Sequence, residues 1–258
     1  MRATMPMIGY QVRWEQKSYW RNPAAAVFTF AFPLLFLVIF TAINGNGTID
    51  IEGGQVKFAQ YYVPAIIAFG LISACYTNLA FTICIRRESG LLKRARGTPL
   101  SPIVYLAGIV GNVIVVAMIL TALIIGLGII AYGVTFPGRY LALIVAIVTG
   151  AFCFSTAGIA ISTFVPNEDA APAIINFVLF PLLFISGTFG PVSSDSALGR
   201  IAVIFPVRHL VQAMVHVFNP FGGGTGIVAS HTLIMIAWGV VCLAVSLRRF
   251  RWEPRIKS

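Results

Sequence analysis

The sequence has few charged residues for its length, and this scarcity excludes most soluble folds. Of its 258 residues only 10% are Asp, Glu, Lys or Arg, whereas 58% are hydrophobic and the mean hydropathy is +0.89. A soluble domain carries about 25% charged residues. Because a protein core cannot absorb this much apolar surface, we expect one all-α integral membrane domain over residues 1–258, with no large soluble domain.

Metal and disulfide motifs are missing as well. The four cysteines, Cys75, Cys84, Cys153 and Cys242, fall inside apolar stretches and form no CxxC pair. We interpret them as small buried hydrophobic residues. The three histidines, at 209, 216 and 231, have no carboxylate or cysteine at ligand spacing, so the sequence predicts no metal site.

Nucleotide and nucleic-acid motifs are also absent. The glycine-rich run 222–226 is not followed by GK[ST], so these residues form no P-loop. The net charge of +10 comes without a recognised nucleic-acid-binding motif, and we expect no nucleic-acid partner. No Asp, Glu, Lys or Arg lies deep in an apolar stretch, which disfavours a proton- or ion-coupled transporter. The energy for any transport is therefore expected to come from a partner.

Six apolar stretches qualify as membrane spans, each of which needs about 20 residues, and we predict six transmembrane helices. They cover residues 24–43, 59–85, 103–132, 140–165, 172–190 and 227–247. The fifth is the shortest, and Pro181 interrupts it. A further apolar piece, 197–219, contains Arg200 and Arg208, so we predict that residues 191–221 form a re-entrant external segment rather than a span.

The distribution of lysine and arginine predicts the orientation. Most of the 18 basic residues precede the first span, separate the second span from the third, or follow the sixth. The remaining four are Lys57, Arg139, Arg200 and Arg208. By the positive-inside rule, both termini lie in the cytoplasm of a multi-pass protein of the inner membrane.

Residues 7–22 form a candidate amphipathic helix before the first span. Basic residues recur every fourth position on one face, Ile8 and Val12 lie on the opposite face, and tryptophans flank them. This pattern predicts a helix lying in the membrane interface in contact with lipid, although Glu15 falls on its apolar stripe. A merely basic flank is the alternative. The residues assigned to the interface are Arg13, Trp14, Lys17, Trp20 and Arg21.

The loop at residues 86–101 carries the most information about mechanism. It combines basic residues with a leucine pair, and we predict a short cytoplasmic helix ended by Gly97 and Pro99. Such a helix could dock a soluble partner, or the charges could serve only as a positive-inside anchor; the residues alone leave both open. The candidate docking residues are Arg86, Arg87, Glu88, Gly90, Leu91, Leu92, Lys93, Arg94, Arg96, Thr98 and Pro99.

The phrase RRESGLLKRARGTPLS between two spans resembles the corresponding loop of ABC type-2 permeases, in particular the daunorubicin-resistance branch. Arg21-Asn22-Pro23 resembles the end of that family's N-terminal elbow helix, and residues 184–189 with Pro191 resemble the end of its fifth span. The segment starting Phe205-Pro206 resembles the piece before its last span. The resemblance implies a homodimer or heterodimer of permeases with ABC ATPase subunits docked on loop 86–101. ATP and Mg²⁺ would then bind the ATPase, with no cofactor in this chain.

Neutral polar residues inside the spans are candidates for a substrate path. They are Asn78, Asn112, Thr121, Asn176 and Ser186. Each could equally bond one helix to another. The favoured function is export of an amphiphilic drug or lipid, because the spans offer no counter-charge. Polysaccharide or lipid-linked glycan export, a membrane-embedded enzyme and a channel are the alternatives.

Overall fold

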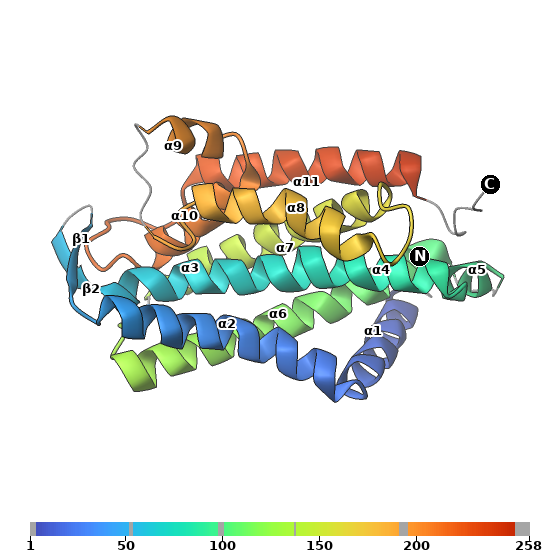
Figure 1. The fold of residues 1–258 in the computed structure, drawn as a ribbon, viewed down its shortest axis with the longest axis horizontal. Helices are drawn as coiled ribbons and strands as arrows, with labels where there is room; N and C mark the ends of the chain where they lie inside the picture. Colours follow the sequence, from blue (N-terminus) through green and yellow to red (C-terminus); the bar gives the residue numbers. More distant parts are fainter. Residues whose placement is uncertain (1–3, 52–53, 98–100, 137, 191–195, 251–258) are drawn as a thin grey trace.

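The computed structural model describes residues 4–51, 54–97, 101–136, 138–190 and 196–250. Its long helices run side by side along one axis and form an elongated bundle (Figure 1). The helices are α1 (Thr4–Trp20), α2 (Pro23–Asn44), α3 (Phe58–Ile72), α4 (Leu79–Glu88), α5 (Leu91–Arg96), α6 (Pro102–Tyr132), α7 (Tyr140–Ser162), α8 (Ala171–Ile185), α9 (Ala197–Ala202), α10 (Pro206–Phe218) and α11 (Ala229–Arg249). The expected helical membrane class is confirmed.

Five continuous helical segments in the described part of the chain are long and apolar enough to cross a membrane. They are α2, the unit formed by α3 and α4, α6, α7 and α11. The remaining predicted span, 172–190, contains α8, which has only 15 residues and is shorter than a full crossing requires. Gly187, with a left-handed φ of 88°, follows the end of α8 and redirects the chain.

The α3–α4 unit forms the centre of the bundle. Every residue of α3 is buried, and a short π-helix, η1 (Ser73–Asn78), joins α3 to α4 without a break. Gly158 of α7 lies against this π-helix, where a Cβ atom would come within 2.8 Å of the Tyr76 carbonyl oxygen. The close approach of α7 to the central helix therefore depends on the missing side chain of Gly158.

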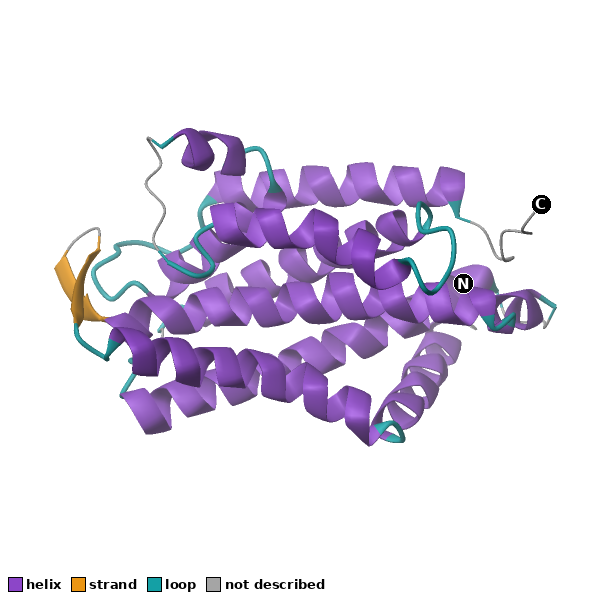
Figure 2. Ribbon diagram, viewed as in Figure 1, coloured by secondary structure: helices purple, strands orange, loops and turns teal. Residues whose placement is uncertain are grey.

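A small antiparallel hairpin, which the sequence did not lead us to expect, connects α2 to α3. Its strands are β1 (Thr48–Ile51) and β2 (Gly54–Lys57), with Ile49 paired to Val56. Figure 2 shows the hairpin at one end of the molecule. The predicted re-entrant stretch 191–221 holds α9 and α10 at the same end, and its residues 191–195 lie outside the described part.

The opposite end of the bundle gathers the basic segments and is called the basic end below. It contains α1, the end of α4, α5, the start of α6 and the last turn of α11 (Figure 1). Helix α4 ends in Arg86 and Arg87, and α11 ends in Arg248 and Arg249. Among the described residues, the fold thus brings to one end basic residues on which the orientation prediction rests.

Candidate functional site

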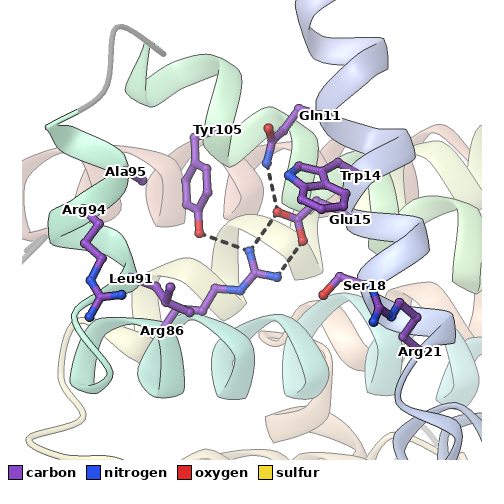
Figure 3. A pocket seen from close by; sticks show the side chains of 10 residues that line it. All are labelled: Gln11, Trp14, Glu15, Ser18, Arg21, Arg86, Leu91, Arg94, Ala95 and Tyr105. Atoms are coloured by element: carbon purple, nitrogen blue, oxygen red, sulfur yellow. Dashed lines mark hydrogen bonds and ion pairs between the residues drawn. The ribbon is translucent and has the colours of Figure 1, made fainter.

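At the basic end, α1 is held against the transmembrane helices by a charged hydrogen-bond network. Arg86, near the end of α4, donates through Nη1 and Nη2 to the two carboxylate oxygens of Glu15, at 2.8 and 2.6 Å. The same Nη1 donates to the hydroxyl of Tyr105 on α6 at 3.1 Å, and Gln11 donates to Glu15 at 3.0 Å. Figure 3 shows Arg86 between Glu15 and Tyr105. Two-pronged pairing of this kind fixes both groups more firmly than one charged hydrogen bond does.

The network explains the carboxylate that interrupts the apolar stripe of the predicted interfacial helix. Glu15 is only 6% exposed, so burying its charge without a partner would be costly. Arg86 supplies that partner from a residue 71 positions away. The stripe faces the bundle, and Glu15 is its one charged contact with α4.

Two glycines of α6 let α1 approach closely. A Cβ atom at Gly108 would come within 2.7 Å of Cβ of Gln11, and one at Gly111 within 2.5 Å of a methyl group of Val12. Beside this contact, Gln16 donates from its amide to the Asn112 carbonyl oxygen at 3.1 Å. Helix α1 is therefore packed on α6 along one face rather than being surrounded by lipid and water.

A cleft of about 510 Å³ lies between α1 and α5 and is called the basic-end cleft below. It is lined by Gln11, Trp14, Glu15, Ser18, Arg21, Arg86, Leu91, Arg94, Ala95 and Tyr105 (Figure 3). Three of these residues are arginines and one is acidic. Because Glu15 is paired with Arg86, Arg21 and Arg94 give the cleft a net positive charge, which suits an acidic or anionic group.

The predicted docking residues divide between the surface and the interior. Leu91, Lys93 and Arg94 are exposed on α5, whereas Leu92 is completely buried. Arg87 is only 3% exposed and donates to the carbonyl oxygens of Ser162, the last residue of α7, and of Val165 beyond it. Leu92 and Arg87 therefore hold the loop in place and do not face a partner in this structure.

The rest of loop 86–101 has a simpler arrangement. Gly90 adopts a left-handed φ of 71° between α4 and α5, a conformation that favours glycine. Glu88 is half-buried, and Gly97 ends α5 as the sequence predicts. The backbone of Arg96 belongs to α5, while Thr98 and Pro99 lie outside the described residues.

The residues assigned to the membrane interface are all exposed, on α1 or directly after it. They are Arg13, Trp14, Lys17, Trp20 and Arg21. The Lys17 ammonium lies 6.0 Å from the ring of Trp14. The ring of Trp20 stacks on Phe30 of α2 at 5.6 Å, so it also joins α1 to the first span. The basic face of the helix is thus exposed, and its contact with lipid head groups stays a prediction.

The candidate path residues differ in their burial. Asn112, Thr121 and Ser186 are buried, and Asn78 and Asn176 are half-buried. The Ser186 hydroxyl lies 2.8 Å from the Leu183 carbonyl oxygen, to which it donates, and 2.7 Å from the Thr188 hydroxyl. None of the five residues lines the basic-end cleft or the second cavity described below.

A second polar cluster, which the sequence did not single out, lies buried between α10 and α11. His209 Nε2 donates to the Val203 carbonyl oxygen at 2.7 Å, because a carbonyl can only accept. In neutral His209, Nδ1 then accepts from Nδ1 of His231 at 2.9 Å. Arg208 beside it is 5% exposed. An arginine and two histidines within short apolar segments were the signal that could have indicated this cluster.

Comparisons with known proteins point to one family. A model of the family described as "ABC-2 type transporter" matches residues 8–219. The chain is also similar to the inner membrane transport permease YadH of Escherichia coli strain K12, with 24% identity over 156 residues, or 60% of this chain and 59% of YadH. YadH of Escherichia coli O157:H7 and of Shigella flexneri shows the same identity over the same length. The chain thus spans less than two thirds of these curated relatives.

Proposed function

Because this chain belongs to the ABC-2 type transporter family, we propose that it is the transmembrane permease subunit of an ATP-driven exporter in the inner membrane. Its basic end faces the cytoplasm and docks an ABC ATPase subunit. The anchored position of α5 beside the basic-end cleft is the observation that carries this proposal. A short helix packed against α4 and α6 offers a soluble partner a rigid contact.

The docking surface consists of the exposed residues of α5. Leu91 is 46% exposed and supplies an apolar contact, while Lys93 and Arg94 supply positive charge. The partner is therefore expected to present a shallow apolar pocket with an acidic rim. ATP and Mg²⁺ bind the partner, since the 258 residues of this chain contain no P-loop.

Movement of the docked helix is transmitted to the membrane through α4. Gly90 joins α5 to α4, and α4 continues through the π-helix into α3 at the centre of the bundle. Arg86 connects the same point to α1 and α6. A displacement of α5 during ATP hydrolysis thus changes the position of the central helix and of α1 together.

The complete exporter contains a second permease subunit, and the substrate is an amphiphilic drug or lipid. The apolar side chains exposed on α2 and α8, among them Phe28, Phe177 and Phe184, provide surface for that subunit or for lipid. Asn78, Asn112, Thr121, Asn176 and Ser186 remain the candidate polar contacts along the path.

Docking is tested by placing a charge on α5. The variant Leu91→Asp is co-expressed with the ABC ATPase of the neighbouring reading frame, and ATPase recovered with the tagged permease is measured. We expect at least a tenfold loss, because a carboxylate at an apolar contact costs more than 1.4 kcal/mol. Leu198→Asp, the same change on the exposed face of α9 at the opposite end, is the control. Equal recovery for both variants would refute docking at α5.

The substrate class is tested separately on the complex in nanodiscs. Amphiphilic drugs or lipids at micromolar concentration are expected to stimulate ATP hydrolysis. Asn176→Leu and Ser186→Leu should shift the stimulation between compounds if these residues contact substrate. Stimulation by a lipid-linked sugar, with none by amphiphiles, would replace the drug or lipid assignment with glycan export.

A further inference from the structure

An apolar crevice of about 290 Å³ lies between α7, α8 and α11, with the start of α10 as part of its wall. The described residues that line it include no charged side chain. Its polar side-chain groups are those of Tyr76, Cys153, Cys242 and Trp238. The Tyr76 hydroxyl donates to the Ile175 carbonyl oxygen at 3.4 Å, and the Trp238 indole to that of Ile204 at 2.9 Å. Both of these donors are therefore used within the protein, and the two thiols are only weak donors toward a polar ligand.

The crevice opens on the outer surface of the bundle. Its deep wall is formed by buried residues, including Phe154 of α7 and Val207 of α10. Its rim is formed by Val178 of α8 and Val241 of α11, which are 42% and 55% exposed. Because α7 and α11 are membrane-spanning helices, this surface is in contact with lipid, and what enters the crevice comes from the bilayer.

The dimensions of the crevice match part of one lipid molecule. Along α7 it extends from Cys153 to Ile161, about 12 Å at 1.5 Å per residue. One leaflet accounts for about half of a hydrocarbon core that is roughly 30 Å thick. The volume lies just below the range of about 300–1,000 Å³ that is typical of pockets for drug-sized ligands. A single acyl chain fits these limits better than a bulky molecule does.

A cation stands at the end of the crevice nearest the basic end. The guanidinium carbon of Arg249, in the last turn of α11, lies 5.1 Å from the ring centre of Phe164. Phe164 lines the crevice and is 45% exposed. Arg249 is itself exposed and therefore free to contact a second group with its remaining donors. It stands where the head group of a lipid with its chain in the crevice would lie.

We propose that this crevice is a binding site for one phospholipid of the leaflet at the basic end, with one acyl chain between α7, α8 and α11 and its phosphate beside Arg249. Burial from water does not drive this binding, since the chain is already in an apolar medium. The side chains that line an empty apolar crevice lack van der Waals contacts on one side, and an acyl chain in the crevice supplies them. Arg249 adds a preference for anionic lipid through a charge-assisted hydrogen bond.

The site is tested with the purified chain in nanodiscs that contain phosphatidylglycerol carrying a diazirine on one acyl chain. After illumination, mass spectrometry is expected to find labelled peptides from α7 after Cys153 and from α11 after Trp238. Ala160→Phe fills the crevice and should reduce labelling there at least fivefold. Val148→Phe, the same kind of enlargement at a 61% exposed position of α7, should leave it unchanged. Equal labelling of Ala160→Phe and wild type would overturn the proposal.

A second measurement does not depend on filling the crevice. Brominated phosphatidylglycerol is expected to quench the fluorescence of Trp238. The contribution of Trp238 to the total tryptophan fluorescence is found by comparing the wild type with Trp238→Phe. Arg249→Gln should lower the preference for phosphatidylglycerol over phosphatidylcholine by about fivefold, the factor expected for one cation near an anionic membrane. Two outcomes would contradict the proposal. If the wild type shows no preference for phosphatidylglycerol, the crevice holds annular lipid. If transported amphiphiles alone displace the lipid, the crevice is a substrate site.

Discussion

Arg86 and Arg87 are adjacent in the sequence, yet their guanidinium groups bind different helices of the bundle. Arg86 binds Glu15 of α1, and Arg87 binds one carbonyl oxygen at the end of α7 and one just beyond it. Successive helical residues point about 100° apart, so one turn of α4 can reach both neighbours. The end of the central helix is thus fixed from two directions at the point where α5 begins.

The Glu15–Arg86 pair is expected to stabilise the fold and to position α1. Glu15→Ala leaves a partly buried guanidinium without its carboxylate and should lower the free energy of unfolding by about 2 kcal/mol. Thermal unfolding in detergent measures this effect. A double-mutant cycle with Arg86→Gln should give a coupling energy of about 1–3 kcal/mol. Strictly additive single effects would mean that the pair contributes nothing to stability.

The contact between α1 and α6 is expected to be sensitive to a single methyl group. Gly108→Ala introduces a Cβ atom against Gln11 and should destabilise the protein by about 1–3 kcal/mol. The control is Gly126→Ala on the same helix, where a Cβ atom meets nothing within 4 Å. This control should be neutral or stabilising by up to about 1 kcal/mol, because alanine favours helix. If the two variants unfold at the same temperature, α1 is not packed closely on α6.

Stability is expected to fall as the pH drops through the histidine range. Burial lowers the pKa of the His209 imidazole below its usual value, and nearby Arg208 lowers it further, against the opposing effect of the hydrogen bond to Val203. The unfolded chain, in which histidine has a pKa of about 6.5, therefore binds the proton more readily. The contribution of neutral His209 to stability is therefore fully present above about pH 6.5 and is lost as the pH falls toward the pKa of the folded state.

This dependence is checked by unfolding the protein in detergent at pH 7.5 and pH 5.5. His209→Gln keeps a donor for Val203 and an acceptor for His231, so it should remain folded and show a smaller pH dependence. Any dependence that remains in this variant belongs to groups other than His209. An unchanged pH dependence in His209→Gln would exclude His209 as its source.

The orientation is tested with single cysteines in a background lacking the four natural ones. Asp50→Cys in β1 and Ser89→Cys before α5 are exposed at opposite ends of the bundle. With the basic end in the cytoplasm, an impermeant thiol reagent should label position 50 in intact cells and position 89 only after the membrane is opened. Labelling of position 89 from outside would reverse the orientation.

Local composition determined the class of this protein and most of its helices. A run of about 20 apolar residues is enough to predict a span, because only a helix or a closed barrel satisfies the backbone in lipid. Gly90 and Gly97 bound the short helix of loop 86–101, as glycines at helix ends commonly do. The span at residues 172–190 stays a prediction: its apolar run continues past Ile185, whereas the helix stops there. Composition does not reveal such a stop.

Only the tertiary structure decided what the polar and charged residues do. Glu15 looked like a flaw in an amphipathic pattern until a residue 71 positions away proved to be its partner. Leu91 and Leu92 looked equivalent as a docking pair, but one is exposed and the other completely buried. The physical reason is that a span forms from contacts within its own segment and the surrounding lipid. Ion pairs, clefts and crevices arise between segments, and their distances are fixed only when the helices pack.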